Sequence, residues 1–293
     1  MTIILGGNRY GKAETHVVRV TRSGPDGALH EIKDINVSIA LQGDFASSHL
    51  SGDNSKVVPT DTQKNTVFAF AREAPVGQIE EFGLRLARHF ARDHASVHQA
   101  RVTIEEYAWD RISVAGRPHP HAFVRAGSEK RSTTVTCTKD QDWIVSGLGD
   151  LVLLKSTGSE FWGYPKDRYT TLPETHDRVL ATAVLARWRY GPGDVAWAEA
   201  HAHARDLLIA AFAAQHSLSL QQTLYAMGEA VLKGRPEIVE IRLSMPNRHH
   251  FVVDLKPFGQ DNDNEVFYAS DRPYGLIEGT VTRDDVDAAE QAW

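Results

Sequence analysis

INVSIALQ, residues 35–42, is the stretch from which the fold class follows. Apolar side chains at every second position, from Ile35 to Leu41, alternate with small or polar ones, and this period of two predicts a half-buried antiparallel strand. A valine-rich run at residues 16–22 lies upstream, and SGPDG at residues 23–27 supplies the glycine and proline of a chain reversal. The sequence therefore opens with two strands joined by a turn.

The same order of elements occurs twice along the chain. In the first half, apolar residues at helical spacing between Ile79 and Phe90 predict an amphipathic helix with arginines on another face. Strand patterns then return at residues 101–114, 121–125 and 133–137. The second half is predicted to contain strands at 142–155 and 179–190, helices at 197–211 and 220–234, and strands at 241–245, 251–255 and 266–269.

This repeated order predicts an α+β fold, in which antiparallel sheets carry helices layered on one face. We expect two units, residues 1–140 and 141–293. A sheet that is covered on one face leaves its edges available for pairing, so assembly into an oligomer is also expected.

Composition excludes several classes of protein. The net charge is −6 with acidic and basic residues interspersed, which argues against a nucleic-acid partner. The single cysteine, Cys137, excludes an internal disulfide, indicates a reducing compartment, and on its predicted strand should be buried and inert. No apolar run reaches the roughly 20 residues that span a membrane. Without a recognisable signal peptide or a C-terminal Ser-Lys-Leu peroxisomal address, we expect a cytoplasmic protein with no membrane partner.

Two predicted helix starts carry the capping-box pattern. TDTQ at residues 60–63 would open a helix over residues 61–72, and SLQQ at residues 219–222 would open a helix in the second half. Each start offers free backbone N–H groups and the positive end of a helix dipole to an anion. Capping boxes are also common as ordinary helix caps that bind no ligand, and this interpretation stays open for both segments. The polar side chains of Asp61 and Gln221 at these starts suit recognition of a heterocycle's edge.

Histidine pairs are the candidates for a metal site. His119 and His121 would share one face of a strand, whereas His201 and His203 would point apart on a helix. No HExxH motif, paired cysteine or aspartate cluster accompanies them. We therefore expect no metal.

The segment GDNSKVVPTDTQKNTVFAF (residues 52–70) resembles the signature region of urate oxidases, also called uricases. The resemblance continues, in family order, through RYGK (9–12), LKSTGSEFWGYPKDRYTTLPETHDR (154–178), LQQTLY (220–225), SMPNRHHFVVDL (244–255) and FGQDNDNEVFYASDRPYGLIEGTV (258–281). Several long matches in one order are far more specific than any single motif. The resemblance implies the tunnelling fold (T-fold), with two tandem antiparallel-sheet units per chain. It also implies a homotetramer that encloses a barrel-like tunnel, with active sites between subunits.

The resemblance also assigns substrate-binding roles to single residues. Phe161 matches the residue that stacks on the purine, and Arg178 the one whose planar fork grips a carbonyl and an anionic nitrogen. The remaining matches are the Gln221 amide and the Leu220 backbone N–H at the opposite edge, Thr60 and Asp61 from the neighbouring subunit, and Asn247 above the ring, where O2 binds. From the residues alone, Arg178 could equally be an ion-pair partner of Asp177 or Glu174.

Lys12, Thr60 and His249 match the positions of a proton relay. A threonine hydroxyl is a poor base alone, so a partly deprotonated lysine beside it would have to activate it. The implied reaction oxidises urate with O2 and water to 5-hydroxyisourate and hydrogen peroxide, in purine degradation. It needs no metal or organic cofactor, because an electron-rich urate dianion can itself donate electrons to O2, the co-substrate.

Two alternatives stay open. A cyclohydrolase-like enzyme of the same fold, acting on a pterin or purine, would need a Cys/His zinc set, which the sequence lacks. A noncatalytic purine-binding relative would be expected to have lost Lys12, Thr60 or His249, and all of them are present.

Overall fold

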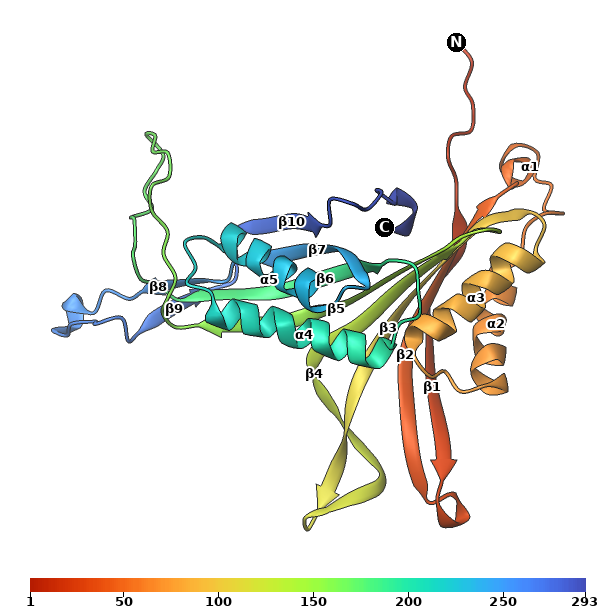
Figure 1. The fold of residues 1–293 in the computed structure, drawn as a ribbon, viewed down its shortest axis with the longest axis horizontal. Coiled ribbons are helices and arrows are strands. Elements are labelled where there is room, and N and C mark those ends of the chain that lie inside the picture. Colours follow the sequence, from red (N-terminus) through yellow and green to blue (C-terminus); the bar gives the residue numbers. More distant parts are fainter. The chain divides into compact units, whose positions relative to one another are not determined.

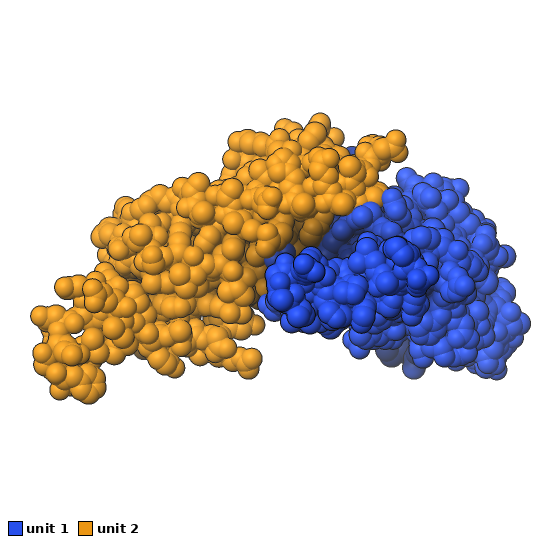
Figure 2. Space-filling view, turned by 90° about the horizontal axis from the view of Figure 1, so that it is seen from below, with its two compact units in different colours: residues 1–147, 287–293 blue, residues 148–286 orange.

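The computed structural model describes residues 1–293 and divides into two compact units. Unit 1 comprises residues 1–147 and 287–293, and unit 2 comprises residues 148–286, as coloured in Figure 2. Each unit follows the order of strands, helices and strands that the sequence predicts (Figure 1).

Unit 1 is an antiparallel sheet with helices on one face. Its strands are β1 (Tyr10–Ser23), β2 (Leu29–Gly43), β3 (Val97–Val114) and β4 (Arg117–Cys137), paired in that order. The helices are α1 (Ala46–Leu50), α2 (Thr60–Glu73) and α3 (Ile79–Asp93), with a short 3-10 turn at Pro25–Gly27. The odd-numbered side chains from Ile35 to Leu41 are buried in one core cluster with the apolar face of α3. The apolar face of β2 that the period of two predicts is therefore the face that packs against the helices in this unit.

Unit 2 repeats this plan. Strand β5 (Asp142–Lys155) enters it, and β6 (Leu180–Tyr190), β7 (Ile238–Pro246) and β10 (Leu276–Thr282) pair antiparallel in that order. Helix α5 (Leu220–Gly234) packs on β7 and β10 and against α4 (Trp197–Ala214). A separate two-stranded ribbon is formed by β8 (His249–Val252) and β9 (Phe267–Ser270). Short 3-10 helices occupy Lys256–Phe258 and, in unit 1, Glu290–Ala292.

Two predicted elements differ from the observed ones. The strands expected at 121–125 and 133–137 are one continuous strand, because β3 pairs along almost all of β4 and accommodates the polar stretch between them through register shifts. The expected Thr60 cap was wrong. Pro59 is the N-cap, its carbonyl accepts from the backbone N–H of Gln63 at 3.1 Å, and Thr60 is already helical. By contrast, Ser219 caps α5 as predicted, accepting from the Gln222 backbone N–H at 3.1 Å.

The structure bears on two other expectations, one about Cys137 and one about membrane-spanning segments. Cys137 is fully buried, and burial raises the pKa of its thiol well above the usual range, in agreement with an inert cysteine. None of the helices has the length and apolar character that crossing a membrane requires.

A buried ion pair holds α3 to the sheet of unit 1. Glu80 is fully buried and accepts from Arg131 at 2.7 Å and from the Ser146 hydroxyl at 2.5 Å. We expect Glu80→Ala to lower the free energy of unfolding by about 3 kcal/mol, because it removes the nearer acidic partner of Arg131 and leaves only Glu106, at 3.9 Å. Urea unfolding measures this, with the exposed neighbour Glu81→Ala as the control. Equal midpoints for the two variants would show that the pair contributes nothing.

Candidate active site

A cavity of about 490 Å³ lies in unit 2, beside the β8–β9 ribbon. Its walls include four of the predicted site residues, Phe161, Arg178, Asn247 and His249. The rest of the walls combine apolar side chains, such as Leu172, Val179 and Phe267, with polar ones, among them Asp177 and His250. A cavity that combines apolar walls with a few convergent polar groups is the usual form of a small-molecule site.

Phe161 and Arg178 are brought together by the loop between β5 and β6. The backbone of Phe161 pairs with that of Thr175 through two hydrogen bonds of 2.8 and 3.0 Å, so the loop folds back on itself. As a result the guanidinium carbon of Arg178 lies 5.2 Å from the centroid of the Phe161 ring. An aromatic face and a planar cation are thus presented side by side.

Arg178 is oriented by a hydrogen bond rather than by an ion pair. Its Nε donates to the Ser159 hydroxyl at 3.2 Å, and Ser159 is fully buried. The two acids that could have neutralised it are engaged elsewhere: Asp177 accepts from Thr157, and Glu174 accepts from the backbone N–H of Gly163 and pairs with Lys166. Burial lowers the pKa of Arg178, which means that its positive charge is held at a desolvation cost. A bound anion would offset that cost.

Asn247 and His249 reach the cavity from the chain that follows β7. The Asn247 backbone N–H donates to the carbonyl of Gly275 at 2.8 Å, and His249 begins the ribbon opposite Ser270. The His249 ring stacks on Phe251 with 5.6 Å between centroids. Burial, together with the charges of Arg178 and His250, lowers the pKa of His249, so its imidazole is neutral at neutral pH and can accept a proton.

Leu220 and Gln221 form the first turn of α5. The Leu220 side chain is buried, while the Gln221 side chain is exposed and has no hydrogen-bond partner within the chain. The backbone N–H groups of this turn face outward from the helix start, where the helix dipole is positive. Neither residue lines the cavity in the single chain.

Unit 1 carries the other predicted residues, Lys12, Thr60 and Asp61. Lys12 lies on β1 opposite Ile39, and Thr60 and Asp61 form the first turn of α2. Hydrogen bonds and charge from Lys64, with smaller contributions from Asn65 and from the charge of Lys12, lower the pKa of Asp61. The Thr60 side chain is exposed and makes no hydrogen bond within the chain, so its hydroxyl is available to a ligand.

Sequence reasoning missed two residues that hold these groups in place. Ser159 orients Arg178, as described above. The Tyr10 hydroxyl accepts from the Val58 backbone N–H at 2.8 Å and donates to the Val58 carbonyl at 3.1 Å. These two hydrogen bonds hold the chain just before Thr60 against β1, the strand that bears Lys12. Tyr10 lies within RYGK and Ser159 within the LKSTGSEF block, so the motifs contained both signals.

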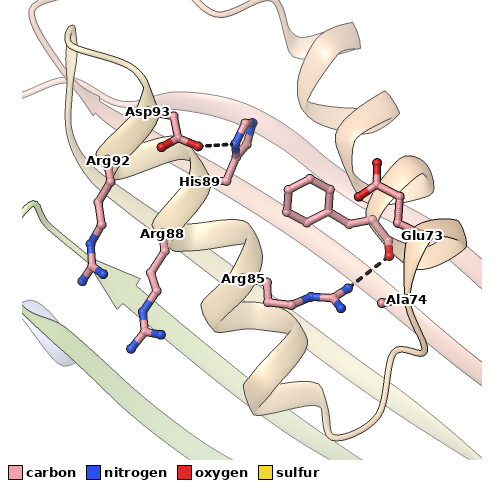
Figure 3. Close-up of a pocket in the computed structure, with 8 residues that line it drawn as sticks. Glu73, Ala74, Arg85, Arg88, His89, Arg92 and Asp93 are labelled. Atoms are coloured by element: carbon pink, nitrogen blue, oxygen red, sulfur yellow. Dashed lines mark hydrogen bonds and ion pairs between the residues drawn. The ribbon is translucent and has the colours of Figure 1, made fainter.

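A second cavity, of about 390 Å³, lies between α2 and α3 and contains none of the predicted residues (Figure 3). Arg88 and Arg92 on its wall are paired with Asp142 at 2.7 and 2.9 Å. Arg85 donates to the Phe70 carbonyl at 3.1 Å, and His89 pairs with Asp93 at 2.8 Å. Because its arginines and its histidine already have partners, this groove is a weaker candidate for an anion than the cavity in unit 2.

The His119–His121 pair lies together on one strand, as the sequence predicts. The rings of His119 and His121 are 4.6 Å apart on β4, and His201 packs against Trp188 at 5.6 Å. The structure contains no group of three or more His, Cys, Asp or Glu side chains arranged to hold a metal ion.

Comparison with known proteins gives a consistent result. The family model described as Uricase matches residues 8–136 and 144–278. A uricase of Arthrobacter globiformis is 53% identical over 291 residues, which are 99% of this chain and 94% of that protein. A uricase of Dictyostelium discoideum is 38% identical over 279 residues, covering 94% of this chain and 96% of that protein.

Solved structures agree with the sequence matches. The crystal structure of uricase from Arthrobacter globiformis superposes with a TM-score of 0.93 at 52% identity, covering 99% of this chain and 98% of that one. A uricase from Bacillus fastidious superposes with a TM-score of 0.79 at 26% identity, covering 94% and 93%. The predicted α+β fold class is thereby confirmed.

Proposed function

The chain belongs to the uricase family, and we propose that the cavity lined by Phe161, Arg178, Asn247 and His249 is where it binds and oxidises urate. It is a urate oxidase, an oxidoreductase of purine degradation. The reaction converts urate, O2 and water into 5-hydroxyisourate and hydrogen peroxide. The observation that carries this assignment to the cavity is the aromatic face of Phe161 beside the half-buried guanidinium of Arg178.

This pair suits a flat anion. The purine plane packs on the Phe161 ring, while Arg178 donates two parallel N–H bonds to a carbonyl oxygen and an anionic nitrogen at the ring edge. Ser159 supports this role because it restrains the Nε of Arg178 and so the plane of the fork. Gln221 and the backbone N–H of Leu220 bind the opposite edge of the ring.

Asn247 and His249 serve the oxygen side of the reaction. The Asn247 amide holds O2 above the ring, and afterwards the water that adds to the oxidised purine. His249, which is neutral at neutral pH, accepts and returns protons together with the Lys12–Thr60 pair.

The remaining residues come from a neighbouring subunit in this proposal. The two T-fold units expected at residues 1–140 and 141–293 correspond in this proposal to unit 1 (1–147 with 287–293) and unit 2 (148–286). Four chains form a homotetramer around a tunnel. Lys12, Thr60 and Asp61 of one chain then complete the cavity of another. The exposed Thr60 hydroxyl and the exposed Gln221 amide, each without a partner in its own chain, support this arrangement.

We further propose that no metal or organic cofactor takes part. Urate held as a dianion is electron-rich enough to transfer electrons to O2 directly, so the protein has only to bind, orient and move protons. The cyclohydrolase-like alternative would need a zinc site of cysteine and histidine, and the chain's one cysteine is buried and inert.

The test is urate oxidation in metal-free buffer that contains a chelator. We expect urate's ultraviolet absorption band to disappear and hydrogen peroxide to be released in equal amount. A noncatalytic relative would bind urate and leave the band unchanged, which would contradict the function. Loss of the band only after a metal is added would contradict the cofactor-free mechanism alone.

A further inference from the structure

Two segments that carry substrate-binding residues are joined beside the cavity. The backbone N–H of Glu160 donates to the Ser217 carbonyl at 2.7 Å, and the Ser217 N–H donates to the Gly158 carbonyl at 2.9 Å. These bonds pair the start of the loop that bears Phe161 with the turn that leads into α5. The two sides of the proposed urate site therefore meet at Glu160.

The carboxylate of Glu160 accepts hydrogen bonds from three rings. One oxygen accepts from His216 Nε2 at 2.6 Å. The other accepts from Trp162 Nε1 at 2.7 Å and from His176 Nδ1 at 3.2 Å. The Glu160 side chain is 18% exposed, whereas the side chains of His216 and His176 are 58% and 74% exposed, so the carboxylate is the shielded member of a cluster at the surface. Its partners come from both segments, so the carboxylate connects the two. A carboxylate with all its partners in one loop would make no such connection.

The residues that form these bonds are close in sequence to residues that we propose bind the substrate. Glu160 immediately precedes Phe161, and His176 is two residues before Arg178. His216 precedes the first turn of α5, where Leu220 and Gln221 bind the opposite edge of urate. A displacement of the Glu160 carboxylate would therefore move the residues that bind both edges of the substrate.

The bonds to His216, His176 and Trp162 lower the pKa of Glu160 to about 2, so the carboxylate stays ionised wherever urate is an anion. The neighbouring charged groups are engaged elsewhere: Lys155 with the Ser217 hydroxyl, Asp177 with Thr157, and Glu174 with Lys166.

We propose that Glu160 is a positioning residue that sets the spacing between the Phe161–Arg178 side of the urate site and the Leu220–Gln221 side. It touches no substrate atom. The inference rests on the proposed function, because the two sides matter only if they bind one ligand. A slot of fixed width lets a flat purine bond at both edges at once, and displacement of catalytic contacts by about 1 Å can cost roughly 100-fold in rate.

The test is a double-mutant cycle on the Glu160–His216 link. We expect Glu160→Gln and His216→Ala each to lower kcat/KM for urate by about 10- to 100-fold. The double variant should lose no more than the worse single, because both changes remove the same link. Binding of xanthine, a flat purine without the C8 oxygen, should weaken in parallel, while the melting temperature stays close to that of the wild type.

Two further variants separate positioning from general damage. His216→Gln places an amide N–H near the position of the imidazole Nε2 and should restore most of the activity lost in His216→Ala. Glu229→Gln makes the same carboxylate-to-amide change on α5, where Glu229 pairs only with Lys233 at 3.0 Å, and should match the wild type.

Additive losses, unchanged kcat/KM in the single variants, or equal losses in His216→Gln and His216→Ala would each overturn the proposal. So would a loss of activity that simply follows a fall in melting temperature. Failure of the wild type to oxidise urate would instead overturn the proposed function. A fully active wild type with fully active variants would overturn only the positioning role of Glu160.

Discussion

Lys12→Met and Thr60→Ala will each lower kcat for urate by about 10²- to 10⁴-fold, the range that a well-placed proton-transfer group contributes. The Thr60 hydroxyl is not used as a helix cap and has no partner in its own chain, so it can serve the substrate. It needs a base to do so, and Lys12 supplies that base in the proposed relay. Since a relay fails when either member is missing, the double variant should lose no more than the worse single variant.

The measurement is kcat at saturating urate, followed by the loss of its ultraviolet band and by peroxide release. Lys56→Met is the matched control, because Lys56 is an exposed lysine of the same unit that lies 4.0 Å from Asp44. We expect it to keep wild-type activity. If the two single losses multiply in the double variant, Lys12 and Thr60 act independently and the relay is wrong.

The parts of the fold that the sequence predicts are those with a local signal. The alternation from Ile35 to Leu41 appears as one buried face of β2, because a strand's side chains point to opposite faces whatever its partner is. Helical spacing from Ile79 to Phe90 likewise appears as the buried face of α3. In both cases the periodicity of the chain itself selects the face that packs.

Elements that form only by packing against a partner distant in the sequence were harder to predict. Strand β10 was not predicted, and its centre is Gly279, a residue that weakens a strand pattern. The structure gives the reason for this glycine: a Cβ there would lie 2.9 Å from the Leu224 side chain of α5. The close approach of α5 to β10 favours glycine at this position, and the same glycine weakens the strand pattern in the sequence. Thr60 shows a related limit, since a capping-box pattern cannot reveal that Pro59 occupies the cap.

The candidate site divides in the same way. The family resemblance identified Phe161 and Arg178, but residue reasoning alone left Arg178 equally plausible as an ion-pair partner of Asp177 or Glu174. The structure shows that Arg178 pairs with neither acid and lies beside the Phe161 ring. That arrangement depends on the backbone pairing of Phe161 with Thr175, a contact across a long loop that no local pattern encodes.

Arg178→Gln should weaken urate binding by about 30-fold or more, since loss of one partner from a buried, hydrogen-bonded charge pair costs about 2–5 kcal/mol. Burial already lowers the pKa of Arg178, so the protein keeps this charge in place without an acidic neighbour to balance it. In the proposed site, the anionic substrate is the group that balances the charge. A glutamine in its place can donate one hydrogen bond but carries no charge and no fork.

The change should appear in affinity, which separates Arg178 from Lys12. We expect KM for urate and the dissociation constant of xanthine to rise much more in Arg178→Gln than in Lys12→Met, whose defect lies in kcat. Arg168→Gln is the control, because Arg168 belongs to the same loop but is exposed and bonds to Tyr169. Equal losses of affinity in the Arg178 and Lys12 variants would mean that the division between a binding cation and a proton-transfer amine is incorrect. Both residues would then act chiefly by attracting the anion.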